Sequence, residues 1–585
     1  MRSAISESVC SRLREHLAGL YEVRIATDVH RRLVERLERE VRTAPSGRDA
    51  VRRRPLSEET AVLITYGDQV REPGVPPLRT LTDVANETIH GLITDLHILP
   101  FFPYSSDDGF SVIDYESVDP ALGDWTDVER LTERFGLMTD LVINHVSAKS
   151  RWFEGFLRGK PEYANYFITV ENGVDLSGVV RPRALPLLTE VETVDGRKKV
   201  WTTFSADQVD LNYANPEVLL RMIDVLLSYV RHGATLIRLD AVAFLWKRIG
   251  SPCIHCEETH RIVKLMRTVL DSVAPEVLLI TETNVPHGEN ISYFGDGKDE
   301  AQMVYQFPLP PLVVDAFHQG SARSLIEWAE TLEPPPGAAT FFNFLASHDG
   351  IGLRPLEGLV PTSRVDGMVE RTLRHGGRVS YMQDTDGRES AYELNISFFD
   401  ALSDPLGDEP IDLQVRKFLT AQGIMLALGG VPGIYFHSLF GSRSWPEGVE
   451  ARGSHRAINR EKLDHAALMR DLEDPDSLRS KVFGGYRTLL AARSGWDAFH
   501  PGAPQRIVRL DDRVFALART GSDESNVLCL HNVSAEAVSM VLDSESVGLR
   551  MEAGIADLLG SEAVEPAGTW TLEPYESAWL VEEAG

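Results

Sequence analysis

Cysteine is scarce in this chain, with 4 in 585 residues. So few cysteines cannot build the dense disulfide framework that holds small secreted proteins together. Long apolar runs are also missing, since none approaches the roughly 20 residues that a transmembrane helix needs. The N-terminus lacks the charged segment followed by an apolar one that marks a secretory signal. We therefore expect a cytoplasmic protein with no membrane partner.

Positive charge is in short supply as well. Lys and Arg number 59 against 87 Asp and Glu, so the formal net charge at pH 7 is −28. Nucleic-acid binding rests on basic patches, and this balance argues against such a partner. An anionic substrate would need a local basic pocket that works against the field of the whole chain. The acidity fits a well-solvated surface and is compatible with a saline cytoplasm.

The sequence contains no glycine-rich phosphate loop and no dinucleotide fingerprint, so we expect no cofactor. Cys253 and Cys256, with His260 nearby, resemble half of a zinc site. A structural zinc ion takes four ligands, and no second cysteine pair exists. We therefore expect no metal.

What the chain does contain is a repeated alternation of apolar run, loop and amphipathic stretch. Its 585 residues are too many for one compact core and are typical of two or three domains. The apolar runs predict eight strands, at Val62–Tyr66, Leu96–Leu99, Thr139–Asn144, Thr235–Asp240, Val277–Thr281, Met303–Gln306, Phe341–Ala346 and Gly433–Phe436. Eight strands that alternate with helices predict an α/β fold, a parallel (β/α)8 TIM barrel.

Composition also predicts the domain boundaries. Residues 1–60 are rich in Arg, Glu and Leu at helical spacing and predict an N-terminal helical segment. We assign 61–147 and 213–500 to the barrel, and 148–212 to a small domain inserted after the third strand. Residues 501–585 alternate apolar and polar positions between Gly and Ser turns, which predicts a C-terminal antiparallel β domain.

Charged and polar side chains stand at the ends of four predicted strands. Arg238 and Asp240 end the fourth strand and share one face of it, because side chains two apart point the same way. His145 ends the third strand, Glu282 the fifth, and Ser347-His-Asp349 the seventh. A structural ion pair or a loop-capping bond would explain any one of them. Four clusters at the carboxyl ends of barrel strands, where active sites of such barrels lie, favour a catalytic interpretation.

Two carboxyl groups at neighbouring strand ends suit the cleavage of a glycosidic bond. In a retaining double displacement the two carboxyls stand about 5–5.5 Å apart. One must be ionised, which fits Arg238 beside Asp240, and the other must keep its proton until it meets the leaving oxygen.

These clusters resemble those of the α-amylase superfamily (glycoside hydrolase family 13). The matching quartet is Asp140-Leu-Val-Ile-Asn-His145, Ile237-Arg-Leu-Asp-Ala-Val242, Ile280-Thr-Glu-Thr283 and Ala346-Ser-His-Asp349. Within the superfamily the chain is similar to the sucrose phosphorylase branch at Ser106–Tyr115, Arg181–Arg183, Gln208–Leu211, Leu309–Leu312, His348–Gly352 and Ala457–Arg460. Within that branch it most resembles the glucosylglycerate phosphorylases, at Arg181–Thr189, Trp201–Ser205, Ser251–His255 and Thr281–His287.

The resemblance implies a retaining glycoside phosphorylase, a glycosyltransferase acting on hexosyl groups. It would cleave 2-O-α-D-glucosylglycerate with inorganic phosphate, a co-substrate, to α-D-glucose 1-phosphate and D-glycerate through a β-glucosyl-enzyme. Alternative substrates are glucosylglycerol, sucrose and sucrose 6-phosphate, and a plain hydrolase of the same fold is a further alternative. The rival from another class is an inert sugar-binding relative, which would have no need of three intact carboxylates. The expected partners are a small-molecule glucoside and phosphate, and the expected state is a monomer or homodimer.

The same resemblance implies roles for individual residues. Asp240 would be the nucleophile, Glu282 the general acid/base, and Asp349 the carboxylate that holds sugar hydroxyls and stabilises the transition state. The implied glucose-binding residues are Asp107, Phe110, His145, Phe204, Arg238, His348 and Arg460. Among these, Asp107 and Arg460 are expected to close the pocket as an ion pair.

The residues expected to bind phosphate and the acceptor are less well defined. Arg183 is the phosphate candidate, because a guanidinium binds phosphate bidentately. Sucrose phosphorylases carry Asp-Leu-Tyr-Gln in the loop after the seventh strand, where this chain reads Ser390-Ala-Tyr-Glu393. We therefore expect a small polyol-like acceptor, with Glu393 accepting hydrogen bonds from its hydroxyls. Other predicted acceptor or phosphate residues are Gln208, Tyr392 and His255, and no group is identified for a glycerate carboxylate.

Overall fold

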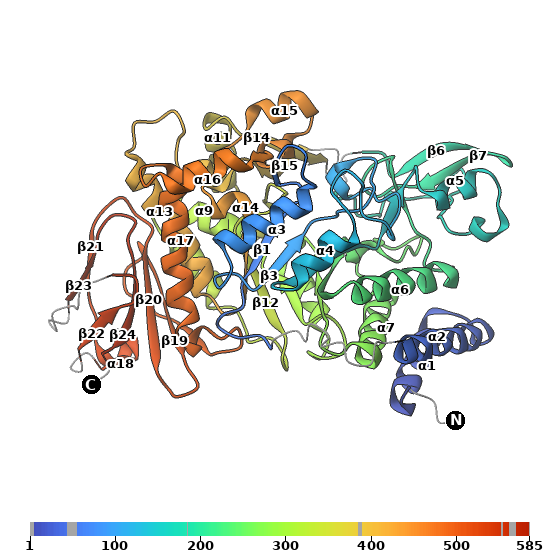
Figure 1. Cartoon of the computed structure of the whole chain (residues 1–585), viewed down its shortest axis with the longest axis horizontal. Helices are drawn as coiled ribbons and strands as arrows, with labels where there is room; N and C mark the ends of the chain where they lie inside the picture. The colour runs from blue at the N-terminus through green and yellow to red at the C-terminus, as the bar shows by residue number, and fades with distance from the viewer. Residues whose placement is uncertain are drawn as a thin grey trace.

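The computed structural model describes residues 5–43, 55–183, 185–383, 389–550, 554–560 and 569–583. Eight parallel strands close into a barrel in the order β1, β16, β12, β11, β10, β9, β4 and β3 (Figure 1). Their bounds are β1 (Val62–Thr65), β3 (Asp95–Ile98), β4 (Gly136–Val142), β9 (Ala234–Asp240), β10 (Leu278–Thr281), β11 (Met303–Tyr305), β12 (Thr340–Phe344) and β16 (Val431–Tyr435). The predicted TIM barrel is confirmed, and each predicted strand corresponds to one of these, with ends shifted by a few residues.

Helices cover the outside of the barrel. They are α3 (Pro77–Thr88), α4 (Trp125–Thr132), α6 (Pro216–Arg231), α7 (Glu257–Val273), α8 (His287–Asn290), α9 (Leu309–Gln319), α10 (Arg323–Ala329), α13 (Ile411–Ala427), α14 (Phe436–Leu439) and α17 (Leu478–Ser494). The strands between them are buried along their length, β9 at all seven positions. That burial is why they are continuous apolar runs in the sequence. Arg238 and Asp240 are therefore charged side chains in an otherwise apolar, buried part of the barrel.

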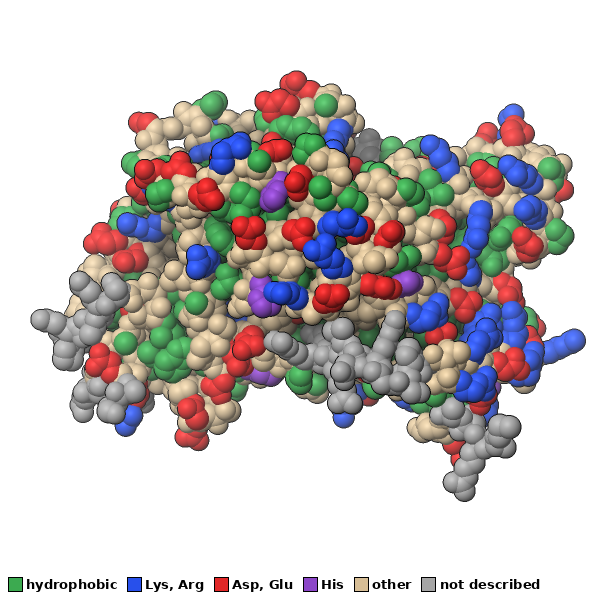
Figure 2. Space-filling view, viewed as in Figure 1, with side chains coloured by type: hydrophobic (Ala, Val, Ile, Leu, Met, Phe, Trp, Pro, Cys, Tyr) green, Lys and Arg blue, Asp and Glu red, His purple; other side chains and the backbone are tan. Residues whose placement is uncertain are grey.

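Two N-terminal helices, α1 (Glu7–Leu20) and α2 (Val23–Thr43), pack against α7 and α6. Ion pairs fasten α2 to α6, with Arg36 Nε 3.0 Å from Asp224 Oδ1. Figure 2 shows Lys and Arg side chains gathered over these two helices, while Asp and Glu are spread over the rest of that face. The expected charged helical segment is thus a solvated outer layer of the barrel.

The segment between β4 and β9 holds two antiparallel pairs and a short helix. β5 (His145–Ser147) pairs with β8 (Gln208–Asp210), and β6 (Leu188–Thr193) pairs with β7 (Gly196–Trp201), with α5 (Arg151–Leu157) between them in sequence. The chain ends in antiparallel sheets. One is built from β18 (Gln505–Ile507), β19 (Val514–Thr520), β20 (Asn526–Asn532), β24 (Ser577–Glu582) and β22 (Ile555–Asp557), and the other from β21 (Val538–Val541) and β23 (Thr569–Leu572). The domain boundaries given above stay a prediction.

The long loop after β12 folds over the barrel mouth. Its strands β13 (Ile351–Gly352), β15 (Glu389–Asn395) and β14 (Arg378–Gln383) form an antiparallel sheet, with the helix α11 (Thr362–Arg374) beside it. Gly350 lets β15 approach, because a Cβ there would lie 2.6 Å from Glu393 Cγ. Further along, α15 (Pro446–Arg452), the 3-10 helix η6 (His455–Asn459) and α16 (His465–Glu473) complete the rim. Within the described residues, no helix has the length and apolar character to cross a membrane.

Candidate active site

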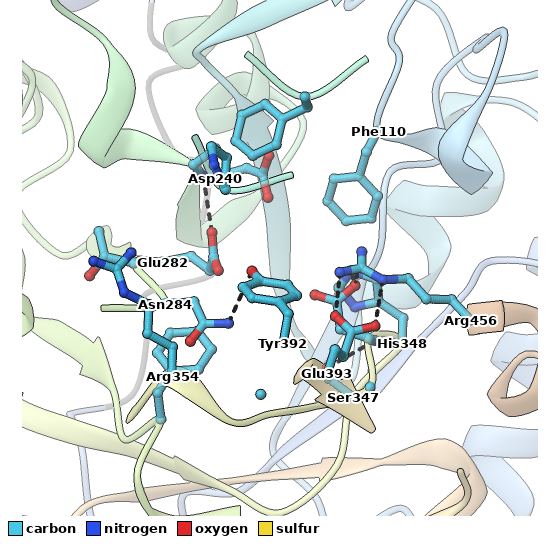
Figure 3. A pocket seen from close by; sticks show the side chains of 18 of the residues that line it. Phe110, Asp240, Glu282, Asn284, Ser347, His348, Arg354, Tyr392, Glu393 and Arg456 are labelled. Atoms are coloured by element: carbon cyan, nitrogen blue, oxygen red, sulfur yellow. Dashed lines mark hydrogen bonds and ion pairs between the residues drawn. The ribbon is translucent and has the colours of Figure 1, made fainter. Parts of the chain in front are cut away.

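One pocket at the carboxyl ends of the barrel strands contains the three predicted catalytic carboxylates, Asp240, Glu282 and Asp349. Figure 3 shows Asp240 and Glu282 in this pocket. The structure also brings most of the other predicted residues to its wall, namely Asp107, Phe110, His145, Arg183, Phe204, Gln208, Arg238, His348, Tyr392 and Glu393. Arg460 and His255 are not among the described residues that line it. The wall also contains residues that the sequence did not single out, including Asn284, Arg354 and Arg456.

Arg238 organises the two central carboxyls. Its Nη1 lies 2.8 Å from Asp240 Oδ1 and its Nη2 lies 3.8 Å from Glu282 Oε2. On the other side the same guanidinium pairs with Asp140, which His97 also contacts at 2.8 Å. Arg238 is therefore held in place by Asp140, and its charge faces Asp240 and Glu282.

A strained residue sets the spacing between the pair. Ala241, directly after β9, has φ 52° and ψ 30°, a left-handed conformation. Such a conformation costs a non-glycine residue about 1–3 kcal/mol and collects at functional sites. It directs the Ala241 N–H at Glu282, where it donates to Oε2 at 3.1 Å. The turn thus holds Glu282 beside Asp240.

Burial raises the pKa of both carboxyls, while the charge of Arg238 opposes the rise. Repulsion from Glu282 raises the pKa of Asp240 further, and repulsion from Asp349 does the same for Glu282. Asp240 makes the closer contact with Arg238, 2.8 Å against 3.8 Å for Glu282, and this contact favours the ionised form of Asp240 more than that of Glu282.

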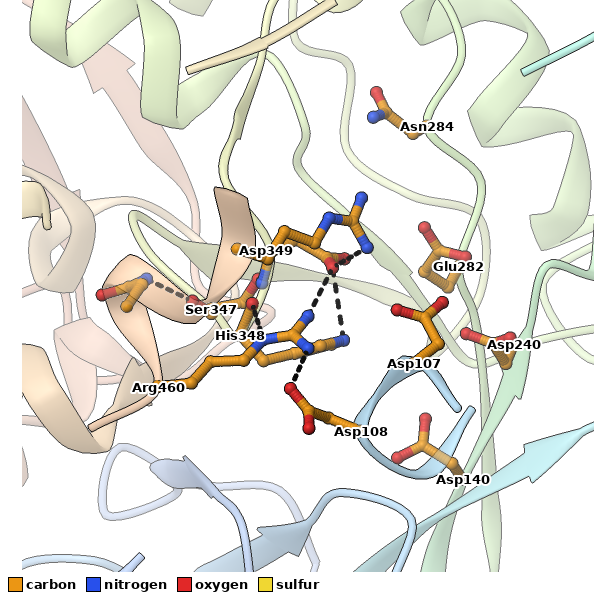
Figure 4. A network of polar contacts seen from close by, with 12 residues as sticks. Asp107, Asp108, Asp140, Asp240, Glu282, Asn284, Ser347, His348, Asp349 and Arg460 are labelled. Atoms are coloured by element: carbon orange, nitrogen blue, oxygen red, sulfur yellow. Dashed lines mark hydrogen bonds and ion pairs between the residues drawn. The ribbon is translucent and has the colours of Figure 1, made fainter. Parts of the chain in front are cut away.

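Asp349 remains ionised. Burial alone would raise its pKa, but Arg456 and His348 hold the pKa well below its usual range. Arg456 Nη1 lies 2.5 Å from Asp349 Oδ1, and His348 Nε2 lies 3.5 Å from the same oxygen. Figure 4 shows this network beside Asp240 and Glu282. A carboxylate fixed in this way keeps a negative charge in the pocket wall.

Arg456 was not singled out in the sequence, and in the structure it binds Glu393. Its Nε and Nη2 donate to the two carboxylate oxygens of Glu393 at 3.0 and 2.6 Å. Glu393 is 3% exposed. Glu393 also lines the pocket, so its predicted hydrogen bonds with acceptor hydroxyls stay a prediction. Glu393 positions Arg456, which in turn holds Asp349.

The predicted ion pair between Asp107 and Arg460 is wrong by one residue. Arg460 Nη1 pairs with Asp108 Oδ2 at 2.7 Å (Figure 4). Asp107 instead lies 3.3 Å from Arg183 Nη2 and 3.4 Å from Gln208 Nε2. Both aspartates have positive φ, 54° and 46°. The tight turn therefore points consecutive carboxylates in different directions, one into the pocket and one behind it.

His255 was expected near the acceptor, and the structure places it elsewhere. With φ 51° it turns away from the pocket and bonds Tyr293 Oη at 2.9 Å and Glu289 at 3.2 Å. In the same loop, Cys253 Sγ donates to the Arg248 carbonyl at 3.3 Å, and in the following helix α7 His260 bonds Glu300. In the ranges that the structure describes, no three His, Cys, Asp or Glu residues are grouped to hold a metal ion.

Aromatic and polar side chains complete the wall. Phe110 stacks on His348 with ring centroids 4.7 Å apart. Phe204 lies under Arg183, whose Cζ is 5.7 Å from the ring centroid. His145 bonds the Phe110 carbonyl at 2.9 Å and Gln208 at 3.1 Å. These contacts fix two ring faces in the pocket, and such faces attract developing positive charge.

Comparison with known proteins gives consistent matches. A family model described as alpha amylase, catalytic domain, matches residues 89–349. A glucosylglycerate phosphorylase of Allomeiothermus silvanus is 49% identical over 583 residues, 99% of this chain and 100% of that protein. A glucosylglycerate phosphorylase of Spirochaeta thermophila is 53% identical over 526 residues, 89% of each. The crystal structure of sucrose 6F-phosphate phosphorylase from Thermoanaerobacter thermosaccharolyticum has a similar fold, with a TM-score of 0.72 at 23% identity, covering 90% of this chain and 100% of that one.

Proposed function

We propose that this chain, which belongs to the α-amylase family and within it to the glucosylglycerate phosphorylases, transfers a glucosyl group between 2-O-α-D-glucosylglycerate and inorganic phosphate. The products are α-D-glucose 1-phosphate and D-glycerate. The observation that carries the proposal is the carboxyl pair, with Arg238 2.8 Å from Asp240 and the backbone of Ala241 holding Glu282 beside it.

The first half-reaction starts with Asp240 ionised and Glu282 protonated. Asp240 attacks the anomeric carbon while Glu282 gives its proton to the glycosidic oxygen. A bond forms between the anomeric carbon and the Asp240 carboxylate, the bond to the glycerate oxygen breaks, and glycerate leaves. The product is a β-glucosyl-enzyme.

In the second half-reaction a phosphate oxygen attacks the same carbon from the side that glycerate left. Glu282, now ionised, takes up the proton that phosphate loses. The bond to Asp240 breaks and the carboxylate is restored. Two inversions give net retention, which accounts for α-glucose 1-phosphate as product.

Asp349 acts in both steps. The sugar ring carries positive charge in the oxocarbenium-like transition state. The ionised Asp349 is kept charged by Arg456 and stabilises that charge while holding sugar hydroxyls. The faces of Phe110 and Phe204 add a weaker attraction of the same sign.

Arg183 is the proposed phosphate ligand. Its contact with Asp107, 3.3 Å, is long for a charge-assisted hydrogen bond, and its side chain is partly exposed in the pocket wall. Arg183→Ala is expected to raise the Michaelis constant for phosphate about tenfold or more, since hydrogen bonds to charged groups contribute about 1.5–3 kcal/mol. The product balance should shift toward free glucose. Phosphorolysis rates across a phosphate titration check this, and an unchanged phosphate dependence would remove Arg183 from the role.

The acceptor is tested by running the reaction in reverse. We expect glucose 1-phosphate with D-glycerate to release phosphate at least about tenfold faster than glucose 1-phosphate with fructose. That ratio needs only about 1.4 kcal/mol of differential binding in the transition state. Glycerol belongs in the same panel, since faster release with glycerol would indicate a glucosylglycerol phosphorylase. Fructose outperforming glycerate would return the chain to the sucrose-cleaving branch, and no turnover with any acceptor would indicate an inert sugar binder.

A further inference from the structure

We propose that Arg354, together with Asn284, binds the carboxylate of the acceptor and thereby selects glycerate over neutral polyols. The inference rests on the proposed function and names the group that recognises the negative end of its substrate. The sequence identified no such group, and neither residue belongs to the catalytic carboxyl network described above.

The charges of the pocket single out Arg354. The described part of the wall contains four arginines, Arg183, Arg238, Arg354 and Arg456. Arg238 faces Asp240, Arg456 is held by Asp349 and Glu393, and Arg183 faces Asp107. Arg354 forms no ion pair with any described residue. Since a carboxylate is attracted most by a cation that no other carboxylate already neutralises, we assign Arg354 to the acceptor carboxylate and leave Arg183 to phosphate.

Asn284 contributes a second polar group on the same side. Its side chain lies against β13, because a Cβ on Gly352 would come within 2.9 Å of its Nδ2. Arg354 follows two residues later, at the start of a 3-10 turn (Arg354–Leu356). The loop after β10 and the loop after β13 therefore bring the amide and the guanidinium to one wall of the pocket.

The side-chain amide of Asn284 has hydrogen-bonding capacity that the described residues do not fill. Its Nδ2 lies 3.4 Å from Tyr392 Oη, and its buried Oδ1 has no partner among the described residues. Burial raises the pKa of Tyr392 to about 12, so the phenol keeps its proton and can donate. The Asn284 NH2 group has two N–H donors and only this one long contact, so a donor remains for a group bound in the pocket that Asn284 lines. An incoming carboxylate would then satisfy that donor.

The position of Asn284 and Arg354 relative to Glu282 fits the shape of glycerate. The acid must reach the glycosidic oxygen, which is O2 of glycerate, and the carboxylate is on the neighbouring carbon. Asn284 is two residues beyond Glu282. Figure 3 shows Glu282, Asn284 and Arg354 on one side of the pocket, with Phe110, His348 and Arg456 on the other. When the sugar occupies the side with Arg456, the leaving group faces Arg354.

The test measures transfer to two acceptors from α-D-glucosyl fluoride. This donor carries no phosphate, so a role of any arginine in phosphate binding does not enter the measurement. For Arg354→Gln, we expect kcat/KM for D-glycerate to fall about tenfold to a hundredfold, the range for losing charged hydrogen bonds. The value for glycerol, which has no carboxylate, should change by less than about threefold. Arg354→Lys, which keeps the charge but loses the fork, should fall in between.

Arg374→Gln is the matched control. It makes the same charge change on the same long loop, at the exposed end of α11, and should leave both acceptors unaffected. Asn284→Asp is an independent variant that places a like charge beside the incoming carboxylate. It should lower transfer to glycerate at least about tenfold more than transfer to glycerol.

The outcomes distinguish failure of this inference from failure of the proposed function. Losses that are equal for glycerate and glycerol in both Arg354→Gln and Asn284→Asp would overturn the assignment, because a structural defect does not distinguish the acceptors. Unchanged transfer to glycerate in Arg354→Gln would also overturn it. A wild-type protein that transfers glucose to glycerol or fructose but not to glycerate would contradict the proposed function itself.

Discussion

Asp240→Asn is expected to lower kcat/KM for glucosylglycerate by about 10⁴-fold or more, a loss of about 5.5 kcal/mol of transition-state stabilisation. The amide is a poor nucleophile and cannot carry the charge that faces Arg238. The substitution keeps the shape of the side chain at the end of β9. Steady-state phosphorolysis measures the loss.

The fold should survive this change. Arg238 retains its pair with Asp140 behind the pocket, so Asp240→Asn does not leave a buried cation without a partner. The melting temperature should therefore stay within a few degrees of the wild type. A folded Asp240→Asn protein with near-normal turnover would show that another group attacks the sugar.

Glu282→Gln should have the second largest effect, and the effect should depend on the leaving group. General acid catalysis contributes about 10²–10⁴-fold when the leaving group is poor. We expect a loss in that range for glucosylglycerate, whose departing oxygen must be protonated. Release of fluoride from α-glucosyl fluoride in a single turnover should slow by less than about tenfold, because fluoride leaves without a proton.

The comparison of the two donors provides its own control. Both donors carry the same glucosyl group into the same pocket and differ only in what leaves. A misfolded or misaligned site would slow both equally. Equal losses in a variant that keeps the wild-type melting temperature would therefore assign the acid role to a residue other than Glu282.

The barrel was predictable because its strands are buried on both faces. β9 is buried at every position, so the sequence shows an unbroken apolar run that ends abruptly in Arg238 and Asp240. Local spacing places those two side chains on one face, and their contact at 2.8 Å follows from it. The same holds for Glu282, because neighbouring parallel strands end at the same edge.

The parts of the site that the sequence missed depend on contacts between distant loops. Arg456 in η6 meets Glu393 in β15 and Asp349 after β12, and no local spacing reveals that three such segments converge. Arg354 was not singled out for the same reason, since its exposure to the pocket depends on the path of the loop after β13.

Two wrong predictions, for Asp107 and for His255, are explained by the backbone conformation at these residues. Asp107 and Asp108 look equivalent in sequence, yet their positive φ angles send one toward Arg183 and the other toward Arg460. His255 also has a positive φ and turns to Tyr293 instead of the pocket. Left-handed residues other than glycine are uncommon and are hard to anticipate from one sequence.

The central claim is that glucose is held covalently on Asp240 between two displacements. The most direct test incubates Glu282→Gln with α-glucosyl fluoride in the absence of phosphate, followed by mass spectrometry of its peptides. Fluoride leaves without acid help, and the next step lacks its base, so the glucosyl-enzyme should accumulate. We predict that the peptide carrying Asp240 gains the mass of one glucosyl group. The same gain on a different residue, or consumption of the fluoride without any adduct, would contradict the account.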